Sequence, residues 1–112
     1  MTSTTDDGTC VTPPVIDGPV EVPDDETLAG LAKAIAHPAR IAILRLLANR
    51  ATCTTGNVVA ELPIPLAQST VSEHLRILRE AGLVVGEIEG PRTRYCVNAT
   101  GLEALHAGVA TL

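Results

Sequence analysis

Short polar side chains crowd the start of the run 68–84, and the run ends in a glycine followed by aliphatic residues. At 3.6 residues per turn, its apolar side chains share one side with a glycine: Val71, Leu75, Leu78 and Gly82. The opposite side carries Ser69, Ser72, Glu73 and Arg76. Hydroxyl, carboxylate and guanidinium groups along one helix face can hydrogen-bond the base edges in a DNA major groove. The run therefore predicts an amphipathic helix that could read DNA.

The polar residues in the first turn of this helix could either contact DNA or cap the helix. Gln68, Ser69, Thr70 and Ser72 lie in the part of a recognition helix that enters the groove. Small polar residues are also what a helix start needs for capping, so one or two of them could do only that.

The charged residues that are candidates for DNA contact lie on this helix and on a hairpin that follows it. Arg76 could reach a guanine or a phosphate, and its alternative is an ordinary solvated helix charge. Glu73 could accept from a cytosine amino group or form a salt bridge to Arg76 or Arg40. Arg92 and Arg94 alternate with a threonine, so both face one side of the hairpin. We expect them to contact the DNA backbone or minor groove, with exposed hairpin arginines as the alternative.

Three further helices must position this surface. Residues 57–62 form a short helix, and a tight connection, Pro63-Ile64-Pro65, joins it to the helix described above. The helix-turn-helix spans about residues 56–81. Asp24 or Asp25 caps a first helix that reaches about residue 36. Pro38 starts a second helix that runs to about residue 49. In this second helix we expect Ile41, Leu44 and Leu47-Ala48 to face inward.

The rest of the chain completes the fold. Residues 83–89 and 92–98 are strands joined through Gly90-Pro91, which makes a β-hairpin wing. Residues 50–55 form a loop, and Thr100 caps a last helix reaching residue 112. The order α-α-α-α-β-β-α predicts a mainly α winged helix-turn-helix over residues 24–112. Residues 1–23, acidic and rich in Pro and Thr, form a flexible arm.

Charge is divided unevenly along the chain. The formal net charge is −5, but residues 1–27 hold seven acidic side chains and no Lys or Arg. Residues 38–96 hold seven Arg against five Glu, so the winged-helix segment is mildly basic. Non-specific DNA binding should therefore be weak and sensitive to salt.

Several classes of protein are disfavoured by composition. No apolar run approaches the length of about 20 residues that spans a membrane, and the N-terminus lacks the features of a signal peptide. We therefore expect a cytoplasmic location and no membrane contact. The chain has no glycine-rich phosphate loop, no quartet of metal ligands and no paired Cys/His nucleophile, which argues against an enzyme. Tyr95 is the only aromatic residue, and an aliphatic core of this size would gain from dimerisation.

Three blocks of sequence resemble the ArsR/SmtB family of bacterial repressors. The run 68–84 resembles the recognition-helix pattern Gln-x-Thr-Val-Ser-x-His-Leu-x-x-Leu-x-x-Ala-Gly-Leu-Val. Residues 31–47, with His37-Pro38-x-Arg40, and residues 90–95 resemble its upstream signature and its wing. The resemblance implies a dimer through the first and last helices, a palindromic operator in double-stranded DNA, and a DNA contact at His74. A structural role for His74 stays open.

The resemblance also raises the question of what releases the repressor. The family's Cys-x-Cys site is absent, since the segment reads Val58-Val59-Ala60-Glu61-Leu62. Its zinc site between the last helices is absent or incomplete, because the last helix offers only Glu103 and His106. In some arsenic-responsive members, thiols lie in the N-terminal arm and in the loop before the helix-turn-helix, and Cys10 and Cys53 fall in those two places.

These thiols suggest a soft inducer, because thiolates select soft ions. The resemblance implies trivalent arsenic or antimony, inorganic or methylated, held by Cys10 and Cys53, with Cys96 a weaker third candidate. No cofactor is required. Redox sensing by thiol oxidation, and cysteines that serve only as small buried hydrophobes, are the alternatives. We predict a homodimeric repressor released by a thiophilic inducer; the alternative is a winged-helix regulator without metal sensing, either redox-responsive or used for protein–protein interaction.

Overall fold

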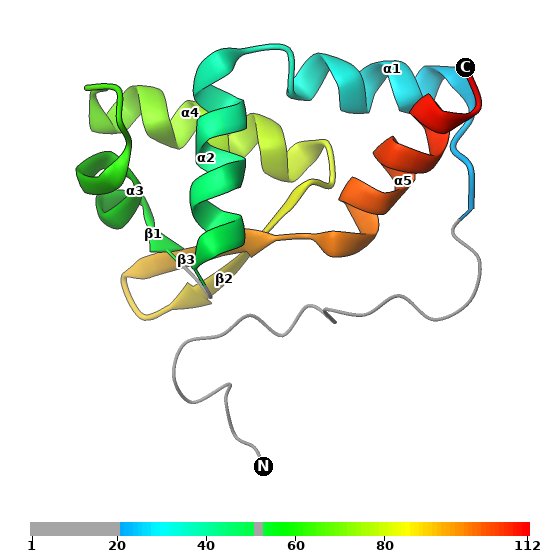
Figure 1. Ribbon diagram of the computed structural model, residues 1–112. Coiled ribbons are helices and arrows are strands. Elements are labelled where there is room, and N and C mark those ends of the chain that lie inside the picture. The colour runs from blue at the N-terminus through cyan, green and yellow to red at the C-terminus, as the bar shows by residue number, and fades with distance from the viewer. Residues whose placement is uncertain (1–20, 51–52) are drawn as a thin grey trace.

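The structure, a computed structural model, describes residues 21–50 and 53–112 (Figure 1). In these residues the elements follow the order α1 (Asp25–Ala34), α2 (Pro38–Asn49), β1 (Cys53–Thr54), α3 (Thr55–Glu61), α4 (Gln68–Glu80), β2 (Val84–Glu89), β3 (Arg92–Val97) and α5 (Ala99–Ala110). The expected winged helix-turn-helix is confirmed. Most of the expected N-terminal arm, residues 1–20, lies outside the described residues.

The wing is part of a three-stranded antiparallel sheet with the order β1-β3-β2. Strand β1 occupies two residues that were expected to be loop, and pairs Cys53 with Tyr95 and Thr54 with Arg94. Two residues are too few to show the alternation that predicts a strand. Pairing with β3 creates this strand, and it fixes the start of α3 against the wing.

Local capping accounts for the starts of α1, α2 and α3. The Asp24 carboxylate accepts the Thr27 N–H at 2.8 Å. Hydrogen bonding from the Thr27 side chain, and then from its backbone N–H, lowers the pKa of that carboxyl group. Pro38 is the first residue of α2, as predicted. A reciprocal capping box joins Thr54 and Asn57 at the start of α3.

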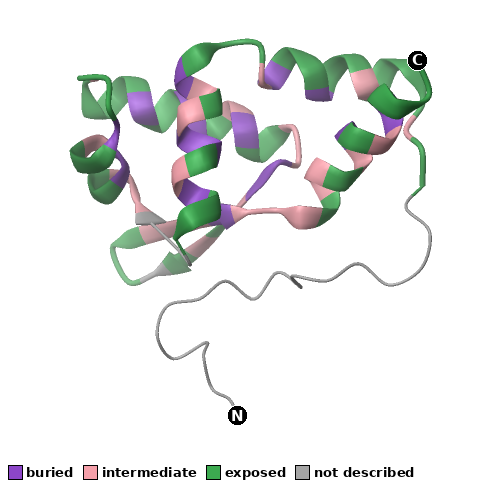
Figure 2. Cartoon of the chain, in the orientation of Figure 1, coloured by how far each residue is buried: buried purple, intermediate pink, exposed green. Residues whose placement is uncertain are grey.

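The hydrophobic core lies where α2, α3 and α4 meet the beginning of β2 (Figure 2). Its fully buried larger side chains are Ile43, Leu47, Leu75, Leu78, Leu83, Val58, Val71 and Val84. The predictions for Ile41 and Ala48 were wrong, since the Ile41 side chain is 39 % exposed and Ala48 is also exposed. The buried stripe of α2 is centred on Ile43 and Leu47, and Ile41 lies about 200° around the helix from Ile43.

A tight turn between α4 and β2 sets the position of α5. Gly82 has φ +86°, which glycine adopts without steric cost, and its carbonyl accepts the Asn98 side-chain N–H at 2.8 Å. A Cβ on Gly101 would lie 2.0 Å from that same carbonyl oxygen. The last helix therefore begins at Ala99, against the turn, and the expected cap at Thr100 was wrong because Asn98 is the N-cap residue.

Helices α1 and α5 pack side by side at one end of the molecule (Figure 1). Apolar side chains at this end remain exposed: Val22, Val109 and Leu112. Among the described residues, no helix combines the length and the apolar character needed to cross a membrane.

Candidate DNA-binding surface

Helix α4 buries one face completely and leaves its first turn in solvent. Val71, Leu75 and Leu78 have no exposed surface. The polar residues of the first turn are all exposed: Gln68, Ser69, Thr70 and Ser72. The N-cap position is occupied by Ala67, which forms no side-chain capping bond. None of these four side chains therefore caps the helix from the N-cap position, and the first turn keeps its hydrogen-bonding groups at the surface.

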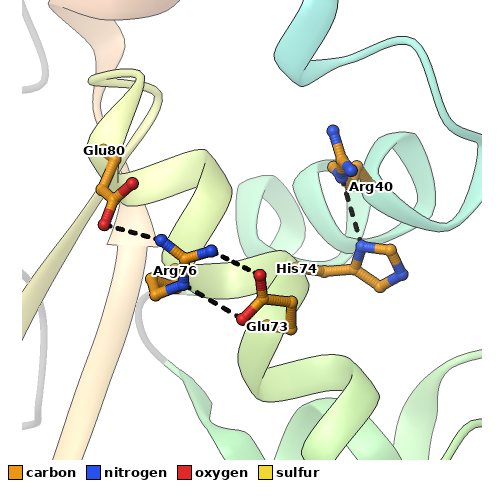
Figure 3. A network of polar contacts seen from close by, with 5 residues as sticks. All are labelled: Arg40, Glu73, His74, Arg76 and Glu80. Carbon is orange, nitrogen blue, oxygen red and sulfur yellow. Dashed lines mark hydrogen bonds and ion pairs between the residues drawn. The ribbon is translucent and has the colours of Figure 1, made fainter.

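Arg76 lies on the outer face of α4 between two glutamates (Figure 3). Its Nε donates to Glu73 Oε1 at 3.0 Å, its Nη2 donates to Glu73 Oε2, and its Nη1 donates to Glu80 Oε2 at 2.8 Å. Hydrogen bonding to these carboxylates raises the pKa of Arg76, and the bond to Arg76 lowers the pKa of Glu73. Of the two partners expected for Glu73, the structure forms the pair with Arg76.

His74 points away from Arg76, toward α2 (Figure 3). Its side chain is only 8 % exposed, and Nδ1 accepts from Arg40 Nε at 3.2 Å. Nη1 of Arg40 also donates to the Lys33 and Ala34 carbonyls, at 3.3 and 3.1 Å. The His37 ring lies 4.7 Å from the His74 ring. His74 therefore joins α4 to the junction of α1 and α2, and this geometry does not offer it to a base.

The environment of His74 favours its neutral form. Burial lowers its pKa most, and the positive charges that His37 and Arg40 can carry lower it further, while Glu73 opposes them. A neutral ring is required for Nδ1 to accept from Arg40, so the lowered pKa agrees with the hydrogen bond.

The backbone register of the hairpin places each wing arginine opposite an acidic position of the neighbouring strand. In the β2–β3 register, Arg94 lies opposite Glu87 and Arg92 opposite Glu89. Both arginines occupy one face of the hairpin, as the alternation with Thr93 predicted. The other face carries Ile88, which is 85 % exposed near the wing tip.

An open cleft of about 530 Å³ lies between the wing, the start of α3 and the start of α4. Its lining is mostly polar: Thr54, Thr55, Gly56, Asn57, Gln68, Pro91, Arg92, Thr93 and Tyr95. It places Gln68 of the recognition helix and Arg92 of the wing around one space. Hydroxyl, amide and guanidinium donors of this kind bind DNA phosphate and sugar oxygens.

The structure describes the three cysteines to different extents. Cys96 in β3 is buried and disulfide-bonded. Cys53 begins β1, and its backbone lies opposite Tyr95, the residue next to Cys96. The side chain of Cys53 and all of Cys10 lie outside the described residues. In the described part of the chain, no three His, Cys, Asp or Glu side chains are placed to hold a metal ion.

Two sets of acidic residues near this surface were not predicted from the sequence. Glu80 follows Arg76 by four residues, a spacing that predicts an ion pair on a helix. The glutamates opposite Arg92 and Arg94 could be assigned only once the hairpin register was known.

Comparison with known proteins places the chain among regulators that carry a helix-turn-helix. A family model described as a helix-turn-helix domain matches residues 35–87. The HTH-type transcriptional regulator CmtR of Mycobacterium tuberculosis is 41 % identical over 73 residues, which are 65 % of this chain and 59 % of CmtR.

Two solved structures are similar in both fold and sequence. One is a possible transcriptional regulator for arsenical resistance, which is 32 % identical with a TM-score of 0.67 and matches over 73 % of this chain and 82 % of its own. The other is a homodimeric winged helix-turn-helix DNA-binding domain from Mycobacterium bovis, a possible ArsR-family transcriptional regulator. It is 26 % identical with a TM-score of 0.61, over 77 % of this chain and 75 % of its own.

Proposed function

Because the chain belongs to the ArsR/SmtB family of winged helix-turn-helix transcriptional regulators, we propose that it is a homodimeric repressor that binds a palindromic operator and is released by a thiophilic inducer. The chain is a transcriptional regulator and not an enzyme. The observation that carries the repressor role is the exposed, uncapped first turn of α4 beside the polar cleft of the wing. Gln68, Ser69, Thr70 and Ser72 contact bases or phosphates there.

The arginines of this surface take different parts in the proposal. Arg76 reads a base from the outer face of α4. Arg92 contacts the DNA backbone from the cleft, and Arg94 supports it from the same face of the wing. The family resemblance implied a DNA contact at His74 and left a structural role open. Because its ring accepts from Arg40, we propose that it takes the structural role and holds α4 against α2. A recognition helix fixed in this way keeps its first turn at a constant angle to the groove.

The inducer we propose is trivalent arsenic, inorganic or methylated, with antimony as the related ion. Cys10 and Cys53 are its ligands. Cys96 is the weaker candidate, because its disulfide must be reduced before its sulfur can bind the ion. Thiolates favour such soft centres, and one similar solved structure is a possible regulator for arsenical resistance. Ligation would change the relative position of the two recognition helices of the dimer. Because half-sites are about one helical turn, roughly 34–36 Å, apart, a small change would cost contacts on both.

The test is fluorescence anisotropy of the reduced full-length protein on a duplex from upstream of its own gene, titrated with a methylated trivalent arsenical. We expect tight, salt-sensitive binding that the arsenical abolishes in the wild type but not in Cys10→Ser or Cys53→Ser. Zinc and cadmium titrations run in parallel distinguish an arsenical from a divalent inducer. Binding that no thiophilic agent weakens would remove the inducer and keep the repressor, and an absence of binding would remove both.

A second candidate, a redox-responsive repressor, is favoured by the disulfide at Cys96. Two thiols that form a disulfide lose two electrons and two protons to an oxidant, and the bond would then hold β3 in place beside the cleft. In the same assay, diamide would weaken DNA binding and dithiothreitol would restore it, with Cys96→Ser insensitive to both. If diamide leaves the DNA affinity of the wild type unchanged, the redox candidate fails.

A further inference from the structure

The surroundings of Arg76 differ from those of an arginine that binds DNA phosphate. Glu73 precedes it by three residues and Glu80 follows it by four. The two carboxylates therefore approach the guanidinium from opposite directions along the helix axis (Figure 3). All three side chains are about half exposed: Arg76 is 46 %, Glu73 54 % and Glu80 61 % exposed. The group therefore lies on the surface that α4 would turn toward a DNA groove, and it remains open to a ligand.

The hydrogen bonds leave a defined set of donors on Arg76. A guanidinium has five N–H groups, and three of them donate to Glu73 and Glu80, one each from Nε, Nη1 and Nη2. One N–H therefore remains on each Nη atom. Because the Glu73 carboxylate bridges Nε and Nη2, the remaining Nη2 donor lies on the far side of that nitrogen, next to Nη1. Two donors at the free end of an arginine match the O6 and N7 acceptors of guanine.

Charge distinguishes the two possible ligands of Arg76, which are a DNA phosphate and a guanine. Its single positive charge is held between two carboxylates, so an approaching phosphate meets an excess of negative charge. A guanine edge offers acceptors without a net charge and meets no such repulsion. The lowered pKa of Glu73 keeps its carboxylate ionised around neutral pH.

We propose that Glu73 and Glu80 are positioning residues that present the free end of Arg76 to a guanine and exclude DNA phosphate from it. This inference rests on the proposed DNA-binding function. The glutamates lower affinity for DNA in general and in return make the reading by Arg76 dependent on sequence. A recognition helix without them would bind more tightly and discriminate less.

The experiment measures sequence discrimination. Fluorescence anisotropy is recorded for the wild type, Glu73→Gln, Glu80→Gln and the double variant. Each protein is titrated onto the upstream duplex, onto a set of duplexes in which each G·C pair in turn is replaced by A·T, and onto an unrelated duplex. In the wild type we expect one G·C pair per half-site whose replacement weakens binding by about fivefold to 150-fold. In the double variant this loss should shrink to below about threefold, and affinity for the unrelated duplex should rise.

Two controls separate positioning from general electrostatics. Glu61→Gln removes an equal charge from the exposed Arg50–Glu61 pair on α3, and should leave the discrimination unchanged. Arg76→Gln should abolish the discrimination at the same base pair, and adding Glu73→Gln to it should then change discrimination no further. Because the proposed dimer carries each substitution twice, a single glutamate variant should also make the dependence of log affinity on log salt steeper by about 1.8, which corresponds to one added phosphate contact in each subunit.

Each outcome decides a different question. If the wild type distinguishes no sequence at all, the proposed function fails and this inference fails with it. If the wild type discriminates but Glu73→Gln and Glu80→Gln do so equally well, only the inference is overturned. It is also overturned if Glu61→Gln reproduces their effect, because a general change in charge would then explain it.

Discussion

At the scale of single residues, His74 makes the stability of the fold depend on pH. Its pKa lies below the ordinary value of 6.5 because of burial and because of neighbouring His37 and Arg40, with Glu73 acting against them. Below about pH 6.5 the unfolded chain therefore binds a proton more readily than the native protein does. The contribution of His74 to the free energy of unfolding should be complete above that pH and decrease as the pH falls through the lowered pKa of the native state.

Urea unfolding at about pH 7.5 and pH 5.5 measures this contribution. The wild type should lose more stability on acidification than His74→Gln, whose amide oxygen can still accept from Arg40 without taking up a proton. His106→Gln is the matched control, since His106 is exposed on α5. Carboxylates such as Asp24 and Glu73 titrate in all three proteins, so their effects cancel in the comparison. Equal acid sensitivity in wild type and His74→Gln would contradict the prediction.

At the scale of elements, the junction of α5 with the α4–β2 turn tolerates no side chain. Gly101→Ala would place a Cβ 2.0 Å from the backbone oxygen of Gly82, and a backbone atom cannot move aside as a flexible side chain can. We expect a loss of about 1–3 kcal/mol in the free energy of unfolding, measured with urea. Gly56→Ala in α3 is the control, because its Cβ would meet only Thr54 Oγ1 at 3.9 Å. That variant should be neutral or slightly stabilising.

The elements themselves were largely predictable from the sequence, and their exact partners were not. Pro38 and Asp24 marked two helix starts because their effects are local to the chain. The inward face of α2 was assigned to Ile41 because Ile41 and Ile43 are equally apolar, and only packing against α4 decides between them. Strand β1 and the glutamates facing the wing arginines depend on pairing between distant segments. A helix beginning at Gln68 with an exposed polar first turn was predictable, but the inward direction of His74 required the position of Arg40.

At the scale of the whole molecule, part of the described positive charge is paired with acid. Arg76 lies between Glu73 and Glu80, and Arg50 pairs with Glu61. With a net charge of −5, the chain has little general attraction for DNA. The homodimeric repressor proposed above must therefore obtain its affinity from specific contacts and from the presentation of two recognition helices together.

Dimerisation is therefore the property on which operator binding should depend most. The end of the molecule formed by α1 and α5 exposes Val109, which is 50 % exposed on α5, and Leu112 beyond it. Val109→Asp would bury an unpaired carboxylate in a dimer formed there, and should weaken the dimer by about a hundredfold. Sedimentation equilibrium measures the dissociation constant, and anisotropy should show a parallel loss on the palindromic duplex. The control is Ile41→Asp on α2, where an apolar side chain is 39 % exposed, and this variant should leave the dimer intact. If Val109→Asp remains as dimeric as the wild type, the interface lies elsewhere on the surface.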